Sequence, residues 1–225
     1  MEPVLFYTPG TCALACMVAL EWRGTPYSVC LVAREERGSD RYRAINPRAQ
    51  VPALRVDGRV LVEVNAIVAH VADRAPEAGM LPANGTAGRD VANQWLAYFG
   101  SGFHPAFWPF YHPERYARDA SAHESVKAAA VDAIRRELTF VDAHLSDKAF
   151  VLGAEQSILD AYLYAMARWG TDMLDLKDFP NLLRHTKTLT ADPRIRHGLA
   201  IERGRELPAP SPALRGRLTL ADVAP

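Results

Sequence analysis

Tyr7-Thr8-Pro9-Gly10-Thr11-Cys12 marks the point where a predicted strand passes directly into a predicted helix. The strand is the short apolar run 4–7, which Pro9 and Gly10 interrupt. Thr11 can cap a helix that continues as far as Trp22. Cys12 should then lie in the first helical turn, where unpaired N–H groups and the positive end of the helix dipole favour a thiolate. The alternative is that Cys12 is a small buried core residue.

The composition is that of an ordinary globular protein. Of the 225 residues, 49% are hydrophobic and 23% are charged, and the formal net charge is zero. We therefore expect neither nucleic acid nor a membrane as a partner. The first residues do not have the pattern of a signal peptide. Three cysteines do not make a disulfide framework or a metal-ligand pattern, so we expect a reducing, cytoplasmic location and no metal.

The first part of the chain alternates strands and helices. Asp57-Gly58 is a two-residue hairpin signal between the third and fourth strands. The resulting order β-α-β-α-β-β-α predicts a small α/β sheet domain over residues 1–75. We expect strands at 4–7, 27–32, 50–56 and 60–63, and helices at 12–22, within 34–43 and at 64–72.

Beyond a linker at 76–87, which is rich in proline and glycine, no strand pattern persists. Apolar residues recur at helical spacing, and Ser157 with Asp160 forms an S-x-x-D cap that we expect to be structural. We therefore predict an all-α helical bundle over residues 88–204. The prolines after Gly204 and the absence of a clear period predict a surface tail over 205–225. The residues on which the bundle prediction rests are Val91, Trp95, Phe99, Phe103, Val126, Ala130, Ile134, Leu138, Pro180 and Pro193.

Several motifs occur in a fixed order. They are Leu5-Phe6-Tyr7-x-Pro9-Gly10-x-Cys12, Asn46-Pro47-x-x-Gln50-Val51-Pro52-Ala53-Leu54, Leu61-Val62-Glu63, His104, Ser157-x-x-Asp160-Ala161-Tyr162 and Trp169. With these motifs the chain resembles the glutathione S-transferase family, most of all its bacterial beta class, over residues 3 to 203. The resemblance implies a thioredoxin-like N-terminal domain, an all-helical C-terminal domain and a homodimer. It also implies that glutathione is the co-substrate and that a small apolar electrophile is the second substrate.

The resemblance assigns site residues in both domains. The catalytic residues that it implies are Cys12 and His104. The glutathione-binding residues that it implies are Tyr7, Thr11, Gln50, Val51, Pro52, Glu63, Val64 and Asn65. The hydrophobic substrate site would be lined by Phe103, Phe107, Trp108 and Tyr111. The alternative is that these aromatic residues belong to the hydrophobic core.

Local chemistry leaves alternatives open at several of these positions. The resemblance implies a cis peptide bond before Pro52, whereas from the residues alone an edge-strand proline is the default. Glu63 can hold the α-amino group of the tripeptide or cap a helix. Val64 stands where the family usually has serine, so only its N–H remains to bind a carboxylate. Asn65 can substitute for that hydroxyl, or its side chain can simply cap the helix.

Two further departures concern the helical domain. Ala97 and Pro105 replace an asparagine and a lysine that beta-class enzymes commonly carry near the histidine. His104 is therefore the polar group that remains there, and it is either functional or structural.

Tyr7 and Thr11 are competing hydroxyl candidates for contact with the glutathione sulfur, but the Pro-Gly-x-Cys match favours Cys12. Three functions stay open: a glutathione transferase, a glutathione-dependent thiol oxidoreductase or peroxidase, and a binding protein with a degraded glutathione site.

Overall fold

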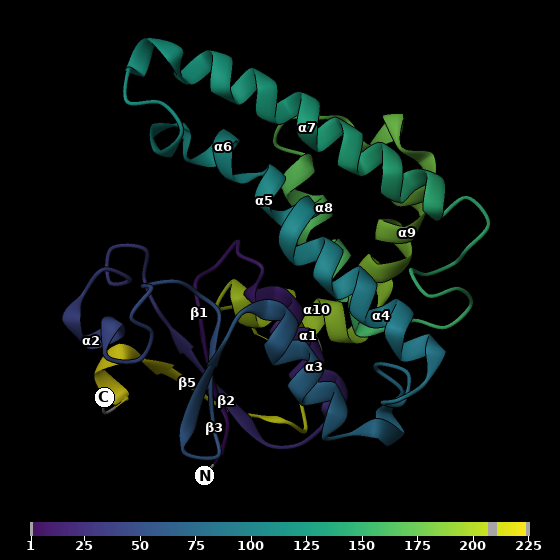
Figure 1. The fold of residues 1–225 in the computed structure, drawn as a ribbon. Coiled ribbons are helices and arrows are strands. Elements are labelled where there is room, and N and C mark those ends of the chain that lie inside the picture. Colours follow the sequence, from purple (N-terminus) through teal and green to yellow (C-terminus); the bar gives the residue numbers. More distant parts are fainter. Residues whose placement is uncertain (1, 207–210, 224–225) are drawn as a thin grey trace. The chain divides into compact units, whose positions relative to one another are not determined.

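The computed structural model describes residues 2–206 and 211–223, which form two compact units (Figure 1). The sheet unit comprises Met1–Thr86 and Thr190–Pro225, and the helical unit comprises Ala87–Leu189. Part of the predicted surface tail, residues 207–210 and 224–225, lies outside the described residues.

The sheet unit begins with the predicted order β-α-β-α-β-β-α, which is confirmed. Asp57 and Gly58 both have positive φ, 51° and 73°, as a two-residue hairpin turn requires. The elements are β1 (Val4–Tyr7), α1 (Ala13–Arg23), β2 (Tyr27–Leu31), α2 (Asp40–Arg43), β3 (Ala53–Val56), β4 (Arg59–Val62), α3 (Val64–Asp73), the 3-10 turn η1 (Pro76–Ala78), α10 (Pro193–Glu202), β5 (Leu214–Thr219) and the 3-10 turn η6 (Leu220–Asp222).

The sheet has the strand order β4-β3-β1-β2-β5. β1 runs parallel to β2 and antiparallel to β3, and β3 runs antiparallel to β4. Phe6 pairs with Ala53, which in turn pairs with Val62. The segments that follow β1, precede β3 and follow β4 therefore all leave the sheet at the same end.

Along β1, and along most of β2 and β3, both faces of the sheet are buried, because side chains that alternate between the two faces meet a layer of other residues on each side. On one face α1 packs against α3 and α10. The fit is close at Gly198 of α10, where a Cβ would lie 2.9 Å from Cδ1 of Leu14. On the other face the core cluster consists of Val4, Phe6, Cys30, Val32, Tyr42, Ile45, Ala53, Leu220 and Val223.

The C-terminal segment corrects the prediction of a surface tail. Residues 214–219 form β5, which extends the sheet by pairing in parallel with β2. Leu220 and Val223 then enter the core cluster beside Tyr42, on the side of the sheet where α2 lies (Figure 1). The alternation of Leu214 and Leu218 with exposed arginines is a strand pattern. The prolines that precede this strand in the sequence led to the prediction of a surface tail.

α10 corrects the predicted boundary of the helical domain, which placed residues 193–204 in the bundle. Its contacts group it with the sheet unit instead. Buried Glu21 of α1 accepts hydrogen bonds from Tyr27 and Ser211, and its other oxygen lies 2.9 Å from Nδ1 of His197 in α10. A single carboxylate thus ties α1, α10 and the segment leading to β5 together.

The helical unit is built around α8, which is buried along most of its length. The predicted cap is confirmed, because the Asp160 carboxylate accepts from the Ser157 N–H at 2.8 Å. Among the described residues, no helix combines the length and the apolar character needed to cross a membrane. The elements are α4 (Ala87–Tyr98), the π-helical turn η2 (Phe99–Phe103), α5 (His104–Ala106), α6 (Trp108–Tyr111), η3 (Pro113–Arg115), η4 (Ala120–Ala122), α7 (His123–His144), α8 (Ile158–Gly170), η5 (Leu176–Asp178) and α9 (Pro180–Ala191).

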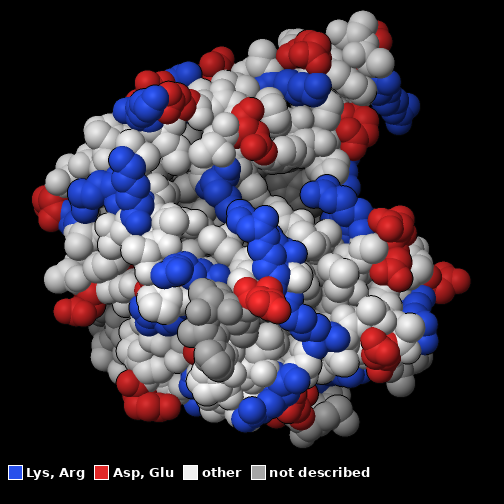
Figure 2. Space-filling view, turned by 180° about the vertical axis from the view of Figure 1, so that it is seen from behind, with Lys and Arg blue, Asp and Glu red and all other residues white. Residues whose placement is uncertain are grey.

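Acidic and basic side chains are interspersed over one face of the protein (Figure 2). The full sequence holds equal totals of 26 acidic and 26 basic residues.

Candidate functional site

Cys12 lies at the entrance of α1, one residue before the helix begins. Gly10 turns the chain with a φ of 78°, a conformation that favours glycine. The Thr11 hydroxyl donates to the Thr8 carbonyl at 2.7 Å and accepts weakly from the Ala13 N–H at 3.4 Å. Thr8 is itself fixed, because its hydroxyl donates to the Val32 carbonyl at 2.6 Å. The turn therefore holds the thiol at the N-terminus of the helix.

The other two cysteines are less suited to thiol chemistry than Cys12. All three cysteines are described residues, and none is in a disulfide. Cys16 and Cys30 have no exposed surface, whereas Cys12 keeps 6%. Burial raises the pKa of Cys16 well above its ordinary value, and the nearby Cys12 adds to this. Burial, helped by Asp222 and Glu36, raises the pKa of Cys30 to about 12.

The peptide bond between Val51 and Pro52 is cis, as the resemblance implies. The ladder between β1 and β3 begins only at Ala53, so Val51 lies ahead of it. The carbonyl of the preceding residue, Gln50, accepts a hydrogen bond from the Tyr42 hydroxyl and another from the Asn46 amide, both at 2.7 Å. These two hydrogen bonds to the Gln50 carbonyl were not predicted from the sequence. The Asn46-Pro47 pair is the sequence motif that indicates them.

Glu63 has an unusual backbone conformation, with φ 69° and ψ 126°, immediately before α3. Strain of this kind in a residue other than glycine is concentrated at functional sites. The Glu63 carboxylate is exposed and lies 3.3 Å from the Arg48 guanidinium. Val64, the first residue of α3, is buried, and Asn65 follows it on the same first turn. The backbone thus presents a helix N-terminus beside a carboxylate.

Three of the predicted binding segments come together in the sheet unit. The Cys12 turn follows β1, the cis peptide precedes β3, and Glu63 with Val64 and Asn65 follows β4. By the pairing of Phe6, Ala53 and Val62, all three leave the sheet at the same end. We call this group the Cys12 site.

Tyr7 does not offer its hydroxyl to the Cys12 site, because this hydroxyl donates to the Ile201 carbonyl of α10 at 3.3 Å. Burial raises the pKa of Tyr7, with Arg217 opposing this shift and Glu202 adding to it. Two residues at the turn were not predicted. Glu202 accepts a hydrogen bond from the Gly10 N–H at 3.0 Å. A Cβ on Gly10 would lie 3.9 Å from Nη2 of Arg34, so this guanidinium stands at the turn.

His104 lies in the helical unit, at the end of a π-helical turn. Pro105 lacks an N–H and cannot continue a regular α-helix, and Gly102 allows close packing on Tyr98. Nδ1 of His104 is 3.1 Å from the Tyr162 hydroxyl, and its ring is 5.1 Å from that of Trp169. Burial lowers the pKa of His104 to about 4. His104 is therefore a neutral imidazole at neutral pH.

The four aromatic residues predicted to line a hydrophobic pocket divide into two pairs. Phe103 and Phe107 are fully buried and touch each other edge to face, so they belong to the core. This corrects the prediction that Phe103 and Phe107 line the hydrophobic substrate site, and it favours the alternative that they are core residues. Trp108 is partly exposed and Tyr111 is 40% exposed, so both can meet a ligand. The Tyr111 hydroxyl donates to the Asp172 carboxylate at 2.7 Å.

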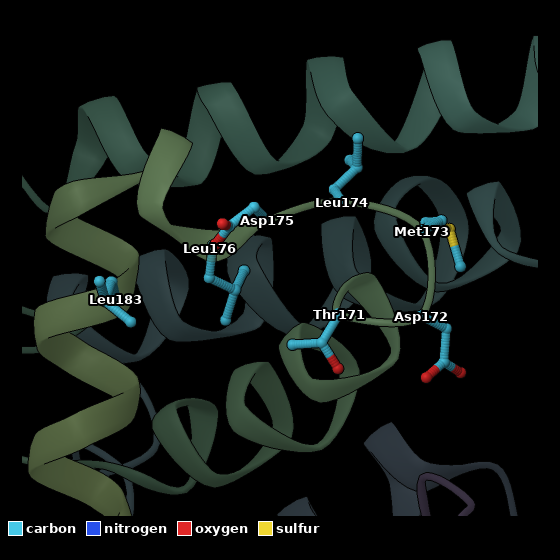
Figure 3. Close-up of a pocket in the computed structure, with 7 residues that line it drawn as sticks. All are labelled: Thr171, Asp172, Met173, Leu174, Asp175, Leu176 and Leu183. Carbon is cyan, nitrogen blue, oxygen red and sulfur yellow. The ribbon is translucent and has the colours of Figure 1, made fainter.

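A shallow hollow of about 580 Å³ lies in the helical unit (Figure 3). It is lined by Thr171, Asp172, Met173, Leu174, Asp175, Leu176 and Leu183, none of which is a predicted site residue. Figure 3 shows these side chains pointing in several directions, with no group of polar atoms that converges on one point. The hollow therefore does not support a site. Within residues 2–206 and 211–223, no cluster of histidine, cysteine and acidic residues suits a metal ion.

Both parts of the chain are similar to known proteins of one family. Residues 12–79 match the family model described as "Glutathione S-transferase, N-terminal domain", and residues 100–193 match that of the C-terminal domain. The "Glutathione S-transferase GstA" of Escherichia coli O157:H7 is 30% identical over 203 residues, which cover 88% of this chain and 98% of the relative.

Two solved structures extend this likeness. The structure of a sphingomonad glutathione S-transferase complexed with glutathione is 31% identical, with a TM-score of 0.81, and the match covers 89% of this chain and 98% of the other. A bacterial beta-class enzyme from Sphingomonas chungbukensis is 33% identical, with a TM-score of 0.80, over 88% and 98% of the two chains. These proteins match almost along their whole length and still leave roughly a tenth of this chain without a counterpart.

Proposed function

Because this chain belongs to the glutathione S-transferase family, we propose that it joins the thiolate of glutathione to small apolar electrophiles at the Cys12 site. The observation that carries the proposal is the convergence of the Cys12 turn, the cis peptide before Pro52 and the N-terminus of α3 at one end of the sheet. The match to family members over 98% of their length supports the same activity.

The arrangement suits each part of the tripeptide. Val51, ahead of the β3 ladder, can pair its backbone with the cysteinyl group of glutathione like an added strand. The Val64 N–H at the start of α3 can receive the γ-glutamyl carboxylate, with no hydroxyl needed. The exposed Glu63 carboxylate is available for the α-amino group. The Cys12 site is also lined by Gln50, Pro52 and Asn65. Thr11 is part of the turn that leads to Cys12.

Cys12 is the residue that we assign to the glutathione sulfur. Tyr7 is unsuited because its hydroxyl is engaged by the Ile201 carbonyl. A thiol is a weak hydrogen-bond donor, so Cys12 is a modest stabiliser of the glutathione thiolate. It can also act covalently: its thiolate attacks one sulfur of oxidised glutathione, a new S–S bond forms, the old one breaks, and one glutathione thiolate leaves. Conjugation is therefore accompanied by thiol–disulfide exchange.

His104 is proposed as the polar group on the electrophile side. A neutral imidazole whose Nδ1 is engaged by Tyr162 has Nε2 left to bind a substrate or to move a proton. Trp108 and Tyr111 supply partly exposed aromatic surface for an apolar electrophile.

We also propose a homodimer in a reducing cytoplasm. Phe140 of α7 and Val91 of α4 are 55% and 47% exposed, and the Phe140 ring lies 5.3 Å from that of Tyr98. Trp95, Leu96 and Phe99, which are also apolar residues of α4 and the turn after it, are themselves buried. The exposed apolar surface on α4 and α7 therefore carries the proposal. The three thiols favour a reducing compartment.

Retention on glutathione-agarose tests the glutathione site, and two assays then separate the chemistries. The wild-type chain should be retained, should conjugate chlorodinitrobenzene and should reduce hydroxyethyl disulfide. Cys12→Ala should abolish the disulfide assay and leave part of the conjugation. Cys16→Ala, on the same helix, is the matched control and should retain both activities. A wild-type chain that is not retained and has neither activity would instead be a binding protein with a degraded site.

A further inference from the structure

The carbonyl of Ile201 is the meeting point of three elements of the sheet unit. It accepts from the Gly204 N–H at 3.1 Å, from the Tyr7 hydroxyl at 3.3 Å and from Nη1 of Arg217 at 3.2 Å. These donors come from the end of α10, from β1 and from β5 respectively. A carbonyl oxygen has two lone pairs, so these donors must share them.

Arg217 also caps the C-terminal end of α10. Its Nη2 donates to the Arg205 carbonyl at 2.7 Å. The guanidinium thus binds one carbonyl in the last turn of α10 and one that lies three residues beyond the helix, and it meets the negative end of the helix dipole. β5 therefore fixes the last turn of α10 through one side chain.

The residue that follows Ile201 connects this cap to the Cys12 turn. Glu202 is only 3% exposed, and its carboxylate accepts from the Gly10 N–H at 3.0 Å. Gly10 lies two residues before Cys12 and has a positive φ, so its peptide orientation sets the course of the turn. The Glu202 side chain can hold the Gly10 N–H only while the end of α10 stays in place.

We propose that Arg217 is a positioning residue for the Cys12 turn: by binding the Ile201 carbonyl in the last turn of α10 and the Arg205 carbonyl just beyond it, Arg217 keeps Glu202 on the Gly10 N–H. The C-terminal strand of this chain thereby helps to control the reaction of Cys12. This inference deepens the proposed function and rests on it for the part that concerns glutathione.

The test compares full-length chains carrying Arg217→Met, Arg217→Lys and Arg215→Met. Arg215 is the matched control, since it is an exposed arginine two positions earlier on the same strand. Hydrogen exchange is measured in peptides covering residues 7–14, with α3 as the internal reference. Arg217→Met should accelerate exchange at the turn by about threefold to tenfold, the worth of one or two hydrogen bonds, and leave α3 unchanged. Arg215→Met should match the wild type, and Arg217→Lys should recover at least half of the effect.

The functional arm measures how fast oxidised glutathione forms a mixed disulfide with Cys12. Arg217→Met should slow this step by about threefold to tenfold, again with recovery in Arg217→Lys. In a Glu202→Gln background the same substitution should add less than about twofold, because Arg217 acts through Glu202. Glu202→Gln alone should also accelerate exchange at the turn, which keeps the test valid if Arg217→Met does not fold.

Two results would overturn the inference. One is an Arg217→Met chain whose exchange at the turn equals that of Arg215→Met. The other is an acceleration that is equal in α3 and at the turn, which would mean general destabilisation. Absence of any Cys12 adduct in the wild-type chain would instead refute the proposed function. The exchange measurements would still decide the role of Arg217.

Discussion

The Tyr162 hydroxyl of α8 lies 3.1 Å from Nδ1 of His104 and so orients the imidazole from a helix in the core of the bundle. Burial is the cause of the low pKa of His104, about 4 against an ordinary 6.5. Because the pKa is lower in the folded chain, the unfolded chain takes up the proton first as the pH falls. The stability that the neutral imidazole contributes is therefore complete above the unfolded pKa and is lost between about pH 6.5 and pH 4.

Replacing His104 should flatten this part of the stability profile. Between about pH 7 and pH 5 the wild-type chain should lose about 2 kcal/mol more than His104→Gln does, as measured by urea unfolding. His112→Gln is the control, since His112 is an exposed partner of Glu114, and it should behave like the wild type. Equal losses in wild type and His104→Gln would mean that the imidazole is not buried as described.

Asp160→Ala should destabilise the helical unit without removing a catalytic group. The carboxylate is fully buried, accepts from the N–H groups of Val151 and Ser157 and from the Ser157 hydroxyl, and lies 2.8 Å from Nε2 of His185. Its loss leaves several buried groups without a partner, so unfolding should become easier by roughly 3–5 kcal/mol.

The exposed cap Asp175 provides the comparison for this prediction, because it also accepts from a backbone N–H at the start of a helical turn. Asp175→Ala should change the stability by less than about 1 kcal/mol. Turnover per correctly folded molecule should stay near the wild-type value in both variants. An Asp160→Ala chain with native stability and no turnover would place Asp160 in the active site.

Gly198→Ala should separate α10 from α1. The new methyl group would lie 2.9 Å from a methyl group of Leu14 and 3.2 Å from one of Val18, so these side chains or the two helices must shift. Overpacking of this kind costs about 1–3 kcal/mol, which a urea unfolding curve resolves. Gly38→Ala is the contrasting variant, since a Cβ there meets nothing within 4 Å, and it should stay within about 0.5 kcal/mol of the wild type. A neutral Gly198→Ala would contradict the close packing of α10.

Phe140→Glu should weaken the proposed dimer, because a carboxylate would replace the most exposed ring on the α4 and α7 surface. Sedimentation at micromolar concentration should give a species near twice 24.8 kDa for the wild type and a shift towards the monomer for the variant. Tyr116→Glu, at a ring that is 56% exposed elsewhere in the helical unit, should leave the dimer intact. A wild-type chain that sediments only as a monomer would refute the dimer.

Local signals in the sequence predicted the parts of the fold that depend on short-range chemistry. Pro9-Gly10 ends β1, Asp57-Gly58 turns between β3 and β4, and Ser157 caps α8, each as expected. These features need only a few neighbouring residues to form. The binding segments of the Cys12 site were predicted from the family resemblance, and strand pairing brings these segments to one end of the sheet.

The features that the sequence did not reveal depend on contacts between distant residues. β5 is stabilised by its pairing with β2, nearly two hundred residues earlier in the chain. Glu202 reaches the Gly10 N–H across 192 positions. The core position of Phe103 and Phe107 likewise depends on how the helices pack, since an aromatic residue on a helix fits a pocket and a core equally well.

The proposed function depends on Cys12 being the thiol that reacts with glutathione. Its most direct test is incubation of the reduced chain with oxidised glutathione, followed by mass-spectrometric mapping of the adduct. We expect one glutathione per chain, on Cys12, because Cys16 and Cys30 have no exposed surface and burial raises the pKa of both. Labelling confined to Cys16 or Cys30 would contradict it.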